Sequence, residues 1–211
     1  RVGGRFTHYT EADGPGATTD DKSRGVFNTG AEITFKASRV WAGTQNKFLD
    51  VNGVRHIIQP LVNYVYVPSP SVHSYSSTDM ELPQFDYQMQ SIRTAPIDFP
   101  EYNSIDSIDA QNVLRIGVGN RFQTKRENGV DNLLSWSLFT DWRINPGIDP
   151  TSGTNLTEQS TFAPLTSSLE LKPRSWISFQ SDTRYDLNGS GILEADQRLT
   201  IEPNTTWSTS L

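Results

Sequence analysis

The sequence predicts an all-β chain, in which antiparallel strands form an up-and-down segment of a transmembrane β-barrel. Three observations lead to this fold class. Apolar and polar residues alternate along long segments, helical periodicity is nearly absent, and the charges of the expected strands lie almost entirely on one face. No run of roughly 18 apolar residues occurs, so the sequence predicts no transmembrane helix.

The composition narrows the possible function classes. The chain has 211 residues and a formal net charge of −6, so it lacks the basic excess that neutralises nucleic-acid phosphates. It has no cysteine, which removes disulfides, thiol chemistry and cysteine-based zinc sites. Its histidines, His8, His56 and His73, lie far apart and outside any metal-binding spacing. We therefore expect no nucleic-acid partner, no metal, no cofactor and no enzymatic activity.

Eight strands are expected where the alternation occurs. In chain order they are residues 2–9, 27–41, 56–67, 112–123, 132–143, 163–172, 176–187 and 197–207. The first is the weakest and the second is the clearest. In the second, Ile33 and Phe35 lie on one face, whereas Glu32 and Lys36 lie on the other, because successive side chains of a strand point to opposite faces.

The two faces of these strands differ in charge. The apolar faces carry a single charged residue, Arg39, near the expected end of its strand. A lipid-facing surface would impose this pattern, because a charge at mid-bilayer costs about 2–4 kcal/mol in a barrel. A soluble sheet with one solvated face would show the same alternation, and a solvated ladder of ion pairs needs no ligand. In a barrel, the opposite faces would line the lumen with Glu32, Lys36, Arg115, Arg121, Asp141, Arg143, Asp182, Arg184, Arg198 and Glu202.

Strand length and connection length favour the membrane. Several expected strands exceed the roughly 5–6 residues of soluble strands and reach the roughly 9–11 residues of membrane strands. Long or moderate connections at 10–25, 68–111, 144–161 and 188–196 alternate with short ones at 124–131 and 172–175, while 42–55 is intermediate. Outer-membrane barrels have such long loops on one side and short turns on the other. Aromatic residues that could form interfacial girdles are Trp41, Trp136, Trp142, Trp207, Tyr64, Tyr66 and Tyr185.

Two ordered sequence blocks carry a family resemblance. The first is Gln59-Pro60 followed by Tyr64-Val65-Tyr66-Val67-Pro68, and the second places Tyr102, Ile105, Asp106, Ile108, Asn112, Gly117 and Arg121 at motif positions. Together they resemble the barrel domain of the LPS-assembly family LptD, also called OstA. The motif residues are Pro60, Tyr64, Tyr66, Pro68, Tyr102, Asp106 and Asn112. The chain departs from the family in lacking cysteines, in having Ser107 where Arg is commoner, and in having no jellyroll before the strands.

The resemblance implies a function and partners. It indicates an outer-membrane translocon component that transports lipopolysaccharide and inserts it into the outer leaflet. The implied partners are lipopolysaccharide, outer-membrane lipids, an LptE-like plug lipoprotein and an LptA-like periplasmic bridge. Because the family barrel is larger than eight strands, we expect residues 1–211 to be an internal segment of the barrel domain. The lumen faces would then meet the sugars and phosphates of the lipopolysaccharide.

Local features add three expectations. Pro60 lies within a strand and cannot donate a ladder hydrogen bond, so it predicts a bulge or break. Residues 56–67 have a second apolar face, which we expect to pack against a plug or an inward-folded loop; the resemblance implies that such a plug would be the LptE-like lipoprotein. The 68–111 connection contains five prolines and several aromatic residues, so we expect it to fold as a cap over the extracellular mouth. Residues 186–197 resemble the start of a calcium-binding loop, but a glycine-rich hairpin turn explains them better.

Two alternatives remain open at this point. The length suits a complete eight-stranded outer-membrane barrel, porin-like or adhesive in function. The alternation also permits a soluble, carbohydrate-binding β-sandwich.

Overall fold

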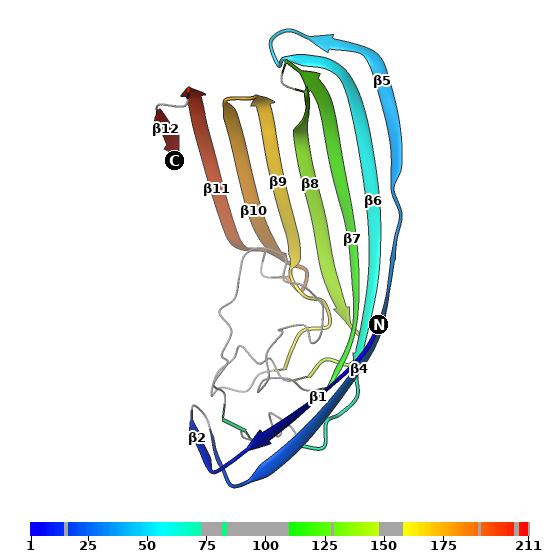
Figure 1. Cartoon of the computed structure of the whole chain (residues 1–211), viewed down its shortest axis with the longest axis vertical. Coiled ribbons are helices and arrows are strands. Elements are labelled where there is room, and N and C mark those ends of the chain that lie inside the picture. Colours follow the sequence, from blue (N-terminus) through cyan, green and yellow to red (C-terminus); the bar gives the residue numbers. More distant parts are fainter. Residues whose placement is uncertain are drawn as a thin grey trace. The chain divides into compact units, whose positions relative to one another are not determined.

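The computed structural model describes residues 1–14, 17–72, 82–83, 110–127, 129–147, 158–189, 191–204 and 207–210. Its regular elements are all strands (Figure 1). They are β1 (Val2–Tyr9), β2 (Ala12–Gly14), β3 (Ala17–Thr19), β4 (Lys22–Thr34), β5 (Ala37–Asn46), β6 (Val51–Val67), β7 (Gln111–Arg126), β8 (Gly129–Arg143), β9 (Leu165–Arg174), β10 (Ile177–Asp186), β11 (Gly191–Asn204) and β12 (Trp207–Ser210). Within the described residues, no helix is long and apolar enough to cross a membrane.

The strands pair in chain order, which confirms the predicted antiparallel up-and-down fold. The described strands form a ten-stranded sheet in the order β1-β4-β6-β7-β8-β9-β10-β11-β12, and β5 also pairs with β6. Strands β2 and β3 form a separate hairpin inside the expected 10–25 loop. The sheet has ten strands instead of eight because the expected strand 27–41 is divided between β4 and β5, and because β12 follows β11. Among the described strands, the second sheet is only the hairpin of β2 and β3, with three residues in each strand, whereas a sandwich would need two larger sheets.

The chain divides into two compact units. Unit 1 comprises Arg1–Glu32, Asn63–Arg115 and Asp141–Ala163, and unit 2 comprises Ile33–Val62, Ile116–Thr140 and Pro164–Leu211. Unit 1 has a small core in which Val26, Val65, Val67 and Val113 pack together. Unit 2 contains β5, β9, β10, β11 and β12 together with parts of the long strands β4, β6, β7 and β8.

Pro60 coincides with a strand break, but the break lies in the neighbouring strand. Strand β6 runs through Pro60 without interruption, whereas Phe35 and Lys36 separate β4 from β5. Ala37 pairs with Ile58, and this register places Pro60 opposite Phe35. Proline has no backbone N–H, so it cannot donate a ladder hydrogen bond to either neighbouring strand. The Thr34 hydroxyl donates to the Pro60 carbonyl at 3.0 Å.

Two connections are shorter than the sequence predicts. The expected 42–55 connection reduces to a turn at residues 47–50, where Asp50 has a φ of 51°. The prediction of a loop at 188–196 is wrong, because β11 already begins at Gly191. The Asp186 carboxylate accepts hydrogen bonds from the backbone and side-chain nitrogens of Asn188, and Gly189 has a φ of 119°. The glycine-rich hairpin turn is therefore confirmed, since a φ in this range favours glycine.

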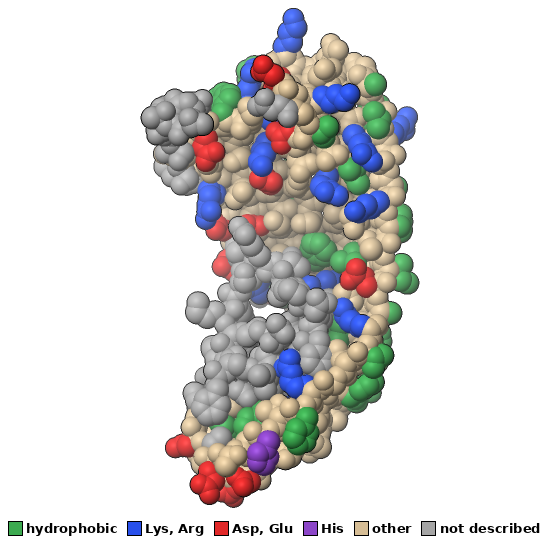
Figure 2. Space-filling model, viewed as in Figure 1, with side chains coloured by type: hydrophobic (Ala, Val, Ile, Leu, Met, Phe, Trp, Pro, Cys, Tyr) green, Lys and Arg blue, Asp and Glu red, His purple; other side chains and the backbone are tan. Residues whose placement is uncertain are grey.

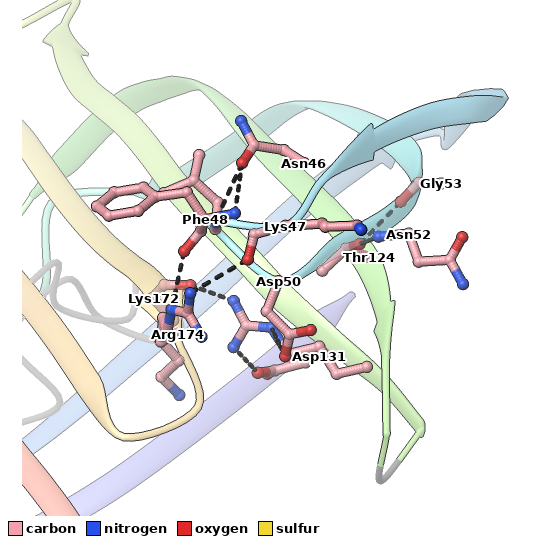
Figure 3. Close-up of polar contacts among 12 residues, drawn as sticks. Asn46, Lys47, Phe48, Asp50, Asn52, Gly53, Thr124, Asp131, Lys172 and Arg174 are labelled. Carbon is pink, nitrogen blue, oxygen red and sulfur yellow. Dashed lines mark hydrogen bonds and ion pairs between the residues drawn. The ribbon is translucent and has the colours of Figure 1, made fainter.

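Two arginines hold the 47–50 turn (Figure 3). Arg174 donates to the carbonyls of Phe48 at 2.8 Å and Lys47 at 3.1 Å, and its guanidinium lies 6.0 Å from the Phe48 ring centre. Arg126, whose side chain is 4% exposed, lies 3.9 Å from the carboxylate of Asp50 in the turn. It also donates to Asp131 at 2.7 Å and to the Lys172 carbonyl at 2.6 Å. The end of β9 is thus tied directly to the β5–β6 turn.

Candidate functional site

The strand register of unit 2 separates polar from apolar side chains. Two rows cross β8, β9, β10 and β11 on one face, which we call the polar face. The rows are Ser137, Ser168, Asp182 and Asp196, and Ser135, Glu170, Gln180 and Arg198. On the other, apolar face the intervening rows are Trp136, Leu169, Ser181 and Gln197, and Leu134, Leu171, Phe179 and Leu199. These apolar-face rows contain no charge.

The polar face carries both signs of charge. Figure 2 shows acidic and basic side chains interspersed on the part of the surface that β9, β10 and β11 form in Figure 1. Arg184 pairs with Glu194 at 3.5 Å, and Lys172 pairs with Glu170 at 3.0 Å. Both pairs are partly exposed, so each contributes little to stability, about 0–1 kcal/mol. Their charges therefore remain accessible to a ligand.

A depression of about 270 Å³ lies within unit 2. Its lining residues are Gln59, Gly119, Asn120, Arg121, Ser135, Trp136, Ser137, Ser168 and Glu170. Small side chains predominate, and they leave space beside the charges of Arg121 and Glu170. Hydroxyls, an amide, a guanidinium and a carboxylate together can bind hydroxylated or phosphorylated ligands. Aromatic residues line it only through Trp136, whose indole N–H donates to the Ser167 hydroxyl at 3.0 Å.

Unit 1 holds a buried ion pair. Arg115 donates two hydrogen bonds to Asp141, at 2.6 and 2.9 Å, in a bidentate arrangement. Their side chains are 9% and 6% exposed. Arg143 is buried as well and donates to the Ser160 carbonyl at 3.1 Å. The fixed geometry indicates that these charges organise the strands, since both partners are satisfied without a ligand.

A second group of polar side chains in unit 1 is connected by hydrogen bonds through Asn63 and is more exposed than the Arg115–Asp141 pair. The side-chain amide nitrogen of Asn63 donates to the Glu32 carboxylate at 3.2 Å, and its side-chain oxygen accepts from the Arg1 guanidinium at 2.8 Å. Asn63 is itself buried. It thus connects charged groups of β4 and the chain start to β6.

The ten predicted lumen residues divide between the units. Unit 1 contains Glu32, Arg115, Asp141 and Arg143, and unit 2 contains Lys36, Arg121, Asp182, Arg184, Arg198 and Glu202. Three of them are buried, namely Arg115, Asp141 and Arg143. Arg121, Asp182 and Arg184 are half-buried, whereas Glu32, Lys36, Arg198 and Glu202 are exposed. Only Arg121 of the ten lines the depression.

Charge alone did not identify the other lining residues. Gln59, Ser135, Ser137 and Ser168 are uncharged, and the signal that could have found them is their position in alternation with apolar residues. Among the motif residues, Pro60, Tyr64, Tyr66, Pro68 and Asn112 are described, and the Asn112 carbonyl accepts from the Ile144 N–H at 2.8 Å. Tyr102 and Asp106 lie outside the described residues.

The described residues offer no group of three or more His, Asp or Glu side chains that could hold a metal ion.

Long antiparallel strands, paired in chain order and charged on one face, define the class of protein: a segment of a transmembrane β-barrel wall. Residues 6–211 match LptD, described as LPS transport system D. The chain therefore belongs to the LptD family, which confirms the resemblance and indicates a function related to lipopolysaccharide transport. This is a family of transport components, not of enzymes. A search of curated proteins finds no match.

Proposed function

We propose that this chain forms part of an outer-membrane translocon wall that passes lipopolysaccharide and inserts it into the outer leaflet. The observation that supports this function is the separation of charges between the two faces of β8 to β11. An amphiphile has a charged sugar-phosphate part and an apolar part. A wall with a polar lumen face and a lipid-facing apolar face gives each part a suitable environment.

The polar face would guide the hydrophilic part. Arg121 in the depression can donate two parallel N–H groups to a phosphate, which suits its planar guanidinium. Ser137, Ser168 and Gln59 supply donors and acceptors for sugar hydroxyls, and Glu170 accepts hydrogen bonds. The mixed charges would keep contact weak and distributed, which suits a path better than a tight binding site.

The connections suggest an orientation. The long connections would face outward and the short turns, such as 47–50, would face the periplasm, where an LptA-like bridge would deliver the lipopolysaccharide. We also propose that residues 68–111 cap the outer mouth. Most of this segment lies outside the described residues, but Leu82 and Pro83 are fully buried, as expected for a loop that packs. Leu61 of β6 is the proposed contact for an LptE-like plug, and photo-crosslinking from this position tests it: crosslinks to lipid alone would contradict the contact.

Site-specific photo-crosslinking of the full protein in cells tests the transport path. Ser168 and its neighbour Leu169 form a matched pair, because they lie on the same strand and on opposite faces. A photo-reactive residue at position 168 should crosslink to lipopolysaccharide. The crosslink should decrease when cellular ATP is depleted, because the family resemblance implies that ATP is spent elsewhere in the transport system. At position 169 this ATP-dependent product should be absent. Equal products at both positions, or a product at 169 alone, would refute the proposed path.

A further inference from the structure

On the apolar face of unit 2, three side chains form a polar row across neighbouring strands: Arg39 of β5, His56 of β6 and Asn120 of β7. Arg39 of β5 pairs in register with His56 of β6, and His56 contacts Phe122 of β7. The expected strand would have placed Arg39 near its end. Strand β5 instead continues to Asn46, so Arg39 lies within a longer hairpin. Its position on an otherwise apolar face calls for a physical reason.

The row is ordered by specific contacts. The guanidinium of Arg39 lies 5.2 Å from the Trp41 ring centre, in a cation–π arrangement. The His56 and Phe122 rings are stacked, with centres 4.2 Å apart and planes 5° from parallel. His56 Nε2 lies 3.1 Å from the Asn120 side-chain oxygen. Among the described residues, no carboxylate forms an ion pair with Arg39.

The hairpin changes character at this row. Towards the 47–50 turn it carries Gln45 and Asn52, whose side chains hydrogen-bond to each other at 3.5 Å. In the opposite direction it carries Phe35, Ile58 and Val62, with Phe35 60% exposed. The row, with the Trp41–Val54 pair next to it on the turn side, therefore lies between an exposed apolar surface and the polar end of the hairpin.

Trp136 of β8 lies near this row, because Trp136 and Asn120, the hydrogen-bond partner of His56, line the same depression. Tryptophans with an apolar ring and a satisfied N–H are typical of the membrane–water interface. Trp41 and Trp136 thus both lie near the polar row of unit 2.

We propose that Arg39, flanked by Trp41 and His56, binds the phosphate of an anionic phospholipid at the membrane boundary on the short-turn side. The site rests on the proposed function, because it requires the apolar face to meet lipid. A cation on the lipid face is costly at mid-bilayer and tolerated near the interface, where it can contact headgroups. The guanidinium donates to phosphate oxygens, and Trp41 holds it at headgroup depth.

The position of Arg39 on the short-turn side determines which lipid we expect at the site. In outer-membrane barrels this side faces the periplasm, and the leaflet there consists of phospholipid. The ligand is therefore a glycerophospholipid such as phosphatidylglycerol. Lipopolysaccharide at the same residues is the competing outcome, and the test separates the two.

The test measures lipids retained by the full protein, purified from nanodiscs that contain phosphatidylcholine, phosphatidylglycerol and lipopolysaccharide. Native mass spectrometry should show phosphatidylglycerol on the wild-type protein and about a fivefold loss in Arg39→Gln. Arg39→Lys should retain it. The matched control is Arg55→Gln, because Arg55 lies close by in the same hairpin but belongs to the polar face, where it donates to Ser38 at 3.4 Å. This control should bind lipid like the wild type.

A second measurement separates this site from the proposed function. Brominated phospholipid should quench Trp41 fluorescence, read as the difference between the wild type and Trp41→Phe. If Trp41 is quenched but Arg39→Gln retains phosphatidylglycerol at the wild-type level, the headgroup site is refuted and the membrane wall stands. The same holds if lipopolysaccharide is the lipid that Arg39→Gln loses. If folded protein shows no Trp41 quenching, the lipid-facing assignment fails, and the site fails with it.

Discussion

Asp141→Asn is the substitution with the largest expected effect on stability. Asp141 accepts both hydrogen bonds of a bidentate pair with Arg115, and each side chain of the pair is less than one-tenth exposed. The asparagine side chain has nearly the same shape but no charge. The change therefore removes the charge that accepts both of these hydrogen bonds from the buried Arg115 guanidinium.

The structure sets the magnitude of this effect. Removing one partner of a buried ion pair costs about 3–5 kcal/mol, because the remaining charge stays desolvated. The Lys172–Glu170 pair provides the contrast, since its side chains are 36% and 32% exposed. Pairs of this exposure contribute about 0–1 kcal/mol. Asp141→Asn should thus lower the free energy of unfolding by several times more than Glu170→Gln.

The assay is urea unfolding of the full protein refolded in detergent, followed by tryptophan fluorescence and by heat-modifiable migration. Arg115→Met combined with Asp141→Leu should recover most of the loss, because an apolar pair needs no charge compensation. Equal destabilisation by Asp141→Asn and Glu170→Gln would refute the reasoning. So would a double variant less stable than Asp141→Asn alone.

Three further predictions use the same protein. Gly117→Val should lower unfolding free energy by about 1–3 kcal/mol, because even a Cβ at this position would overlap the Phe139 ring. Arg174→Ala should loosen the β5–β6 turn by about 1 kcal/mol, which appears as roughly fivefold faster tryptic cleavage there. Leu169→Arg should cost about 2–4 kcal/mol and reduce membrane assembly in cells, whereas Ser168→Arg should leave assembly near the wild-type level.

Each of these has a contradicting result. Adding Phe139→Ala to Gly117→Val should restore part of the stability, and strict additivity of the two changes would exclude the proposed overlap. Lys125→Ala is the control for the turn, because Lys125 is exposed and neighbours the buried Arg126. If Arg174→Ala and Lys125→Ala raised tryptic cleavage at the 47–50 turn equally, the role of Arg174 would be contradicted. Arginines that are tolerated equally at positions 168 and 169 would contradict a lipid-facing surface.

The sequence was sufficient for the strand pattern but not for strand ends. Alternation identified every long strand of the sheet, because side chains of period two determine which residues can share a face. It missed that β5 continues to Asn46 and that β11 begins at Gly191. Glycine and polar residues near a turn continue a strand as readily as they interrupt it when backbone pairing is available. The break expected at Pro60 itself was wrong, because β6 continues through Pro60 and the interruption lies at Phe35 and Lys36, between β4 and β5.

The candidate site was predictable only in part. Charge and the alternation of side chains predicted that Arg121 and Arg198 lie on the polar faces of their strands, and the structure pairs Arg198 with Gln180. The alternation of side chains between the two faces cannot show which residues enclose a depression. The depression beside Arg121 and Ser137 could therefore be identified only from the structure. Likewise, nothing in the sequence pairs Arg115 with Asp141, because that contact depends on the register between β7 and β8.

The separation of faces also determines the register itself. Asp182 pairs with Asp196 and Gln180 with Arg198 in β10 and β11. A one-residue slip of β11 would move Asp196 and Arg198 to the apolar face, and an arginine at mid-bilayer there costs about 2–4 kcal/mol. The register shift that does occur lies between Arg184 and Tyr185, beyond both rows and next to the turn. Charged residues of the polar face, which are proposed to guide lipopolysaccharide, therefore also exclude alternative strand pairings. Substitutions that remove these charges should weaken the strand register and also reduce transport.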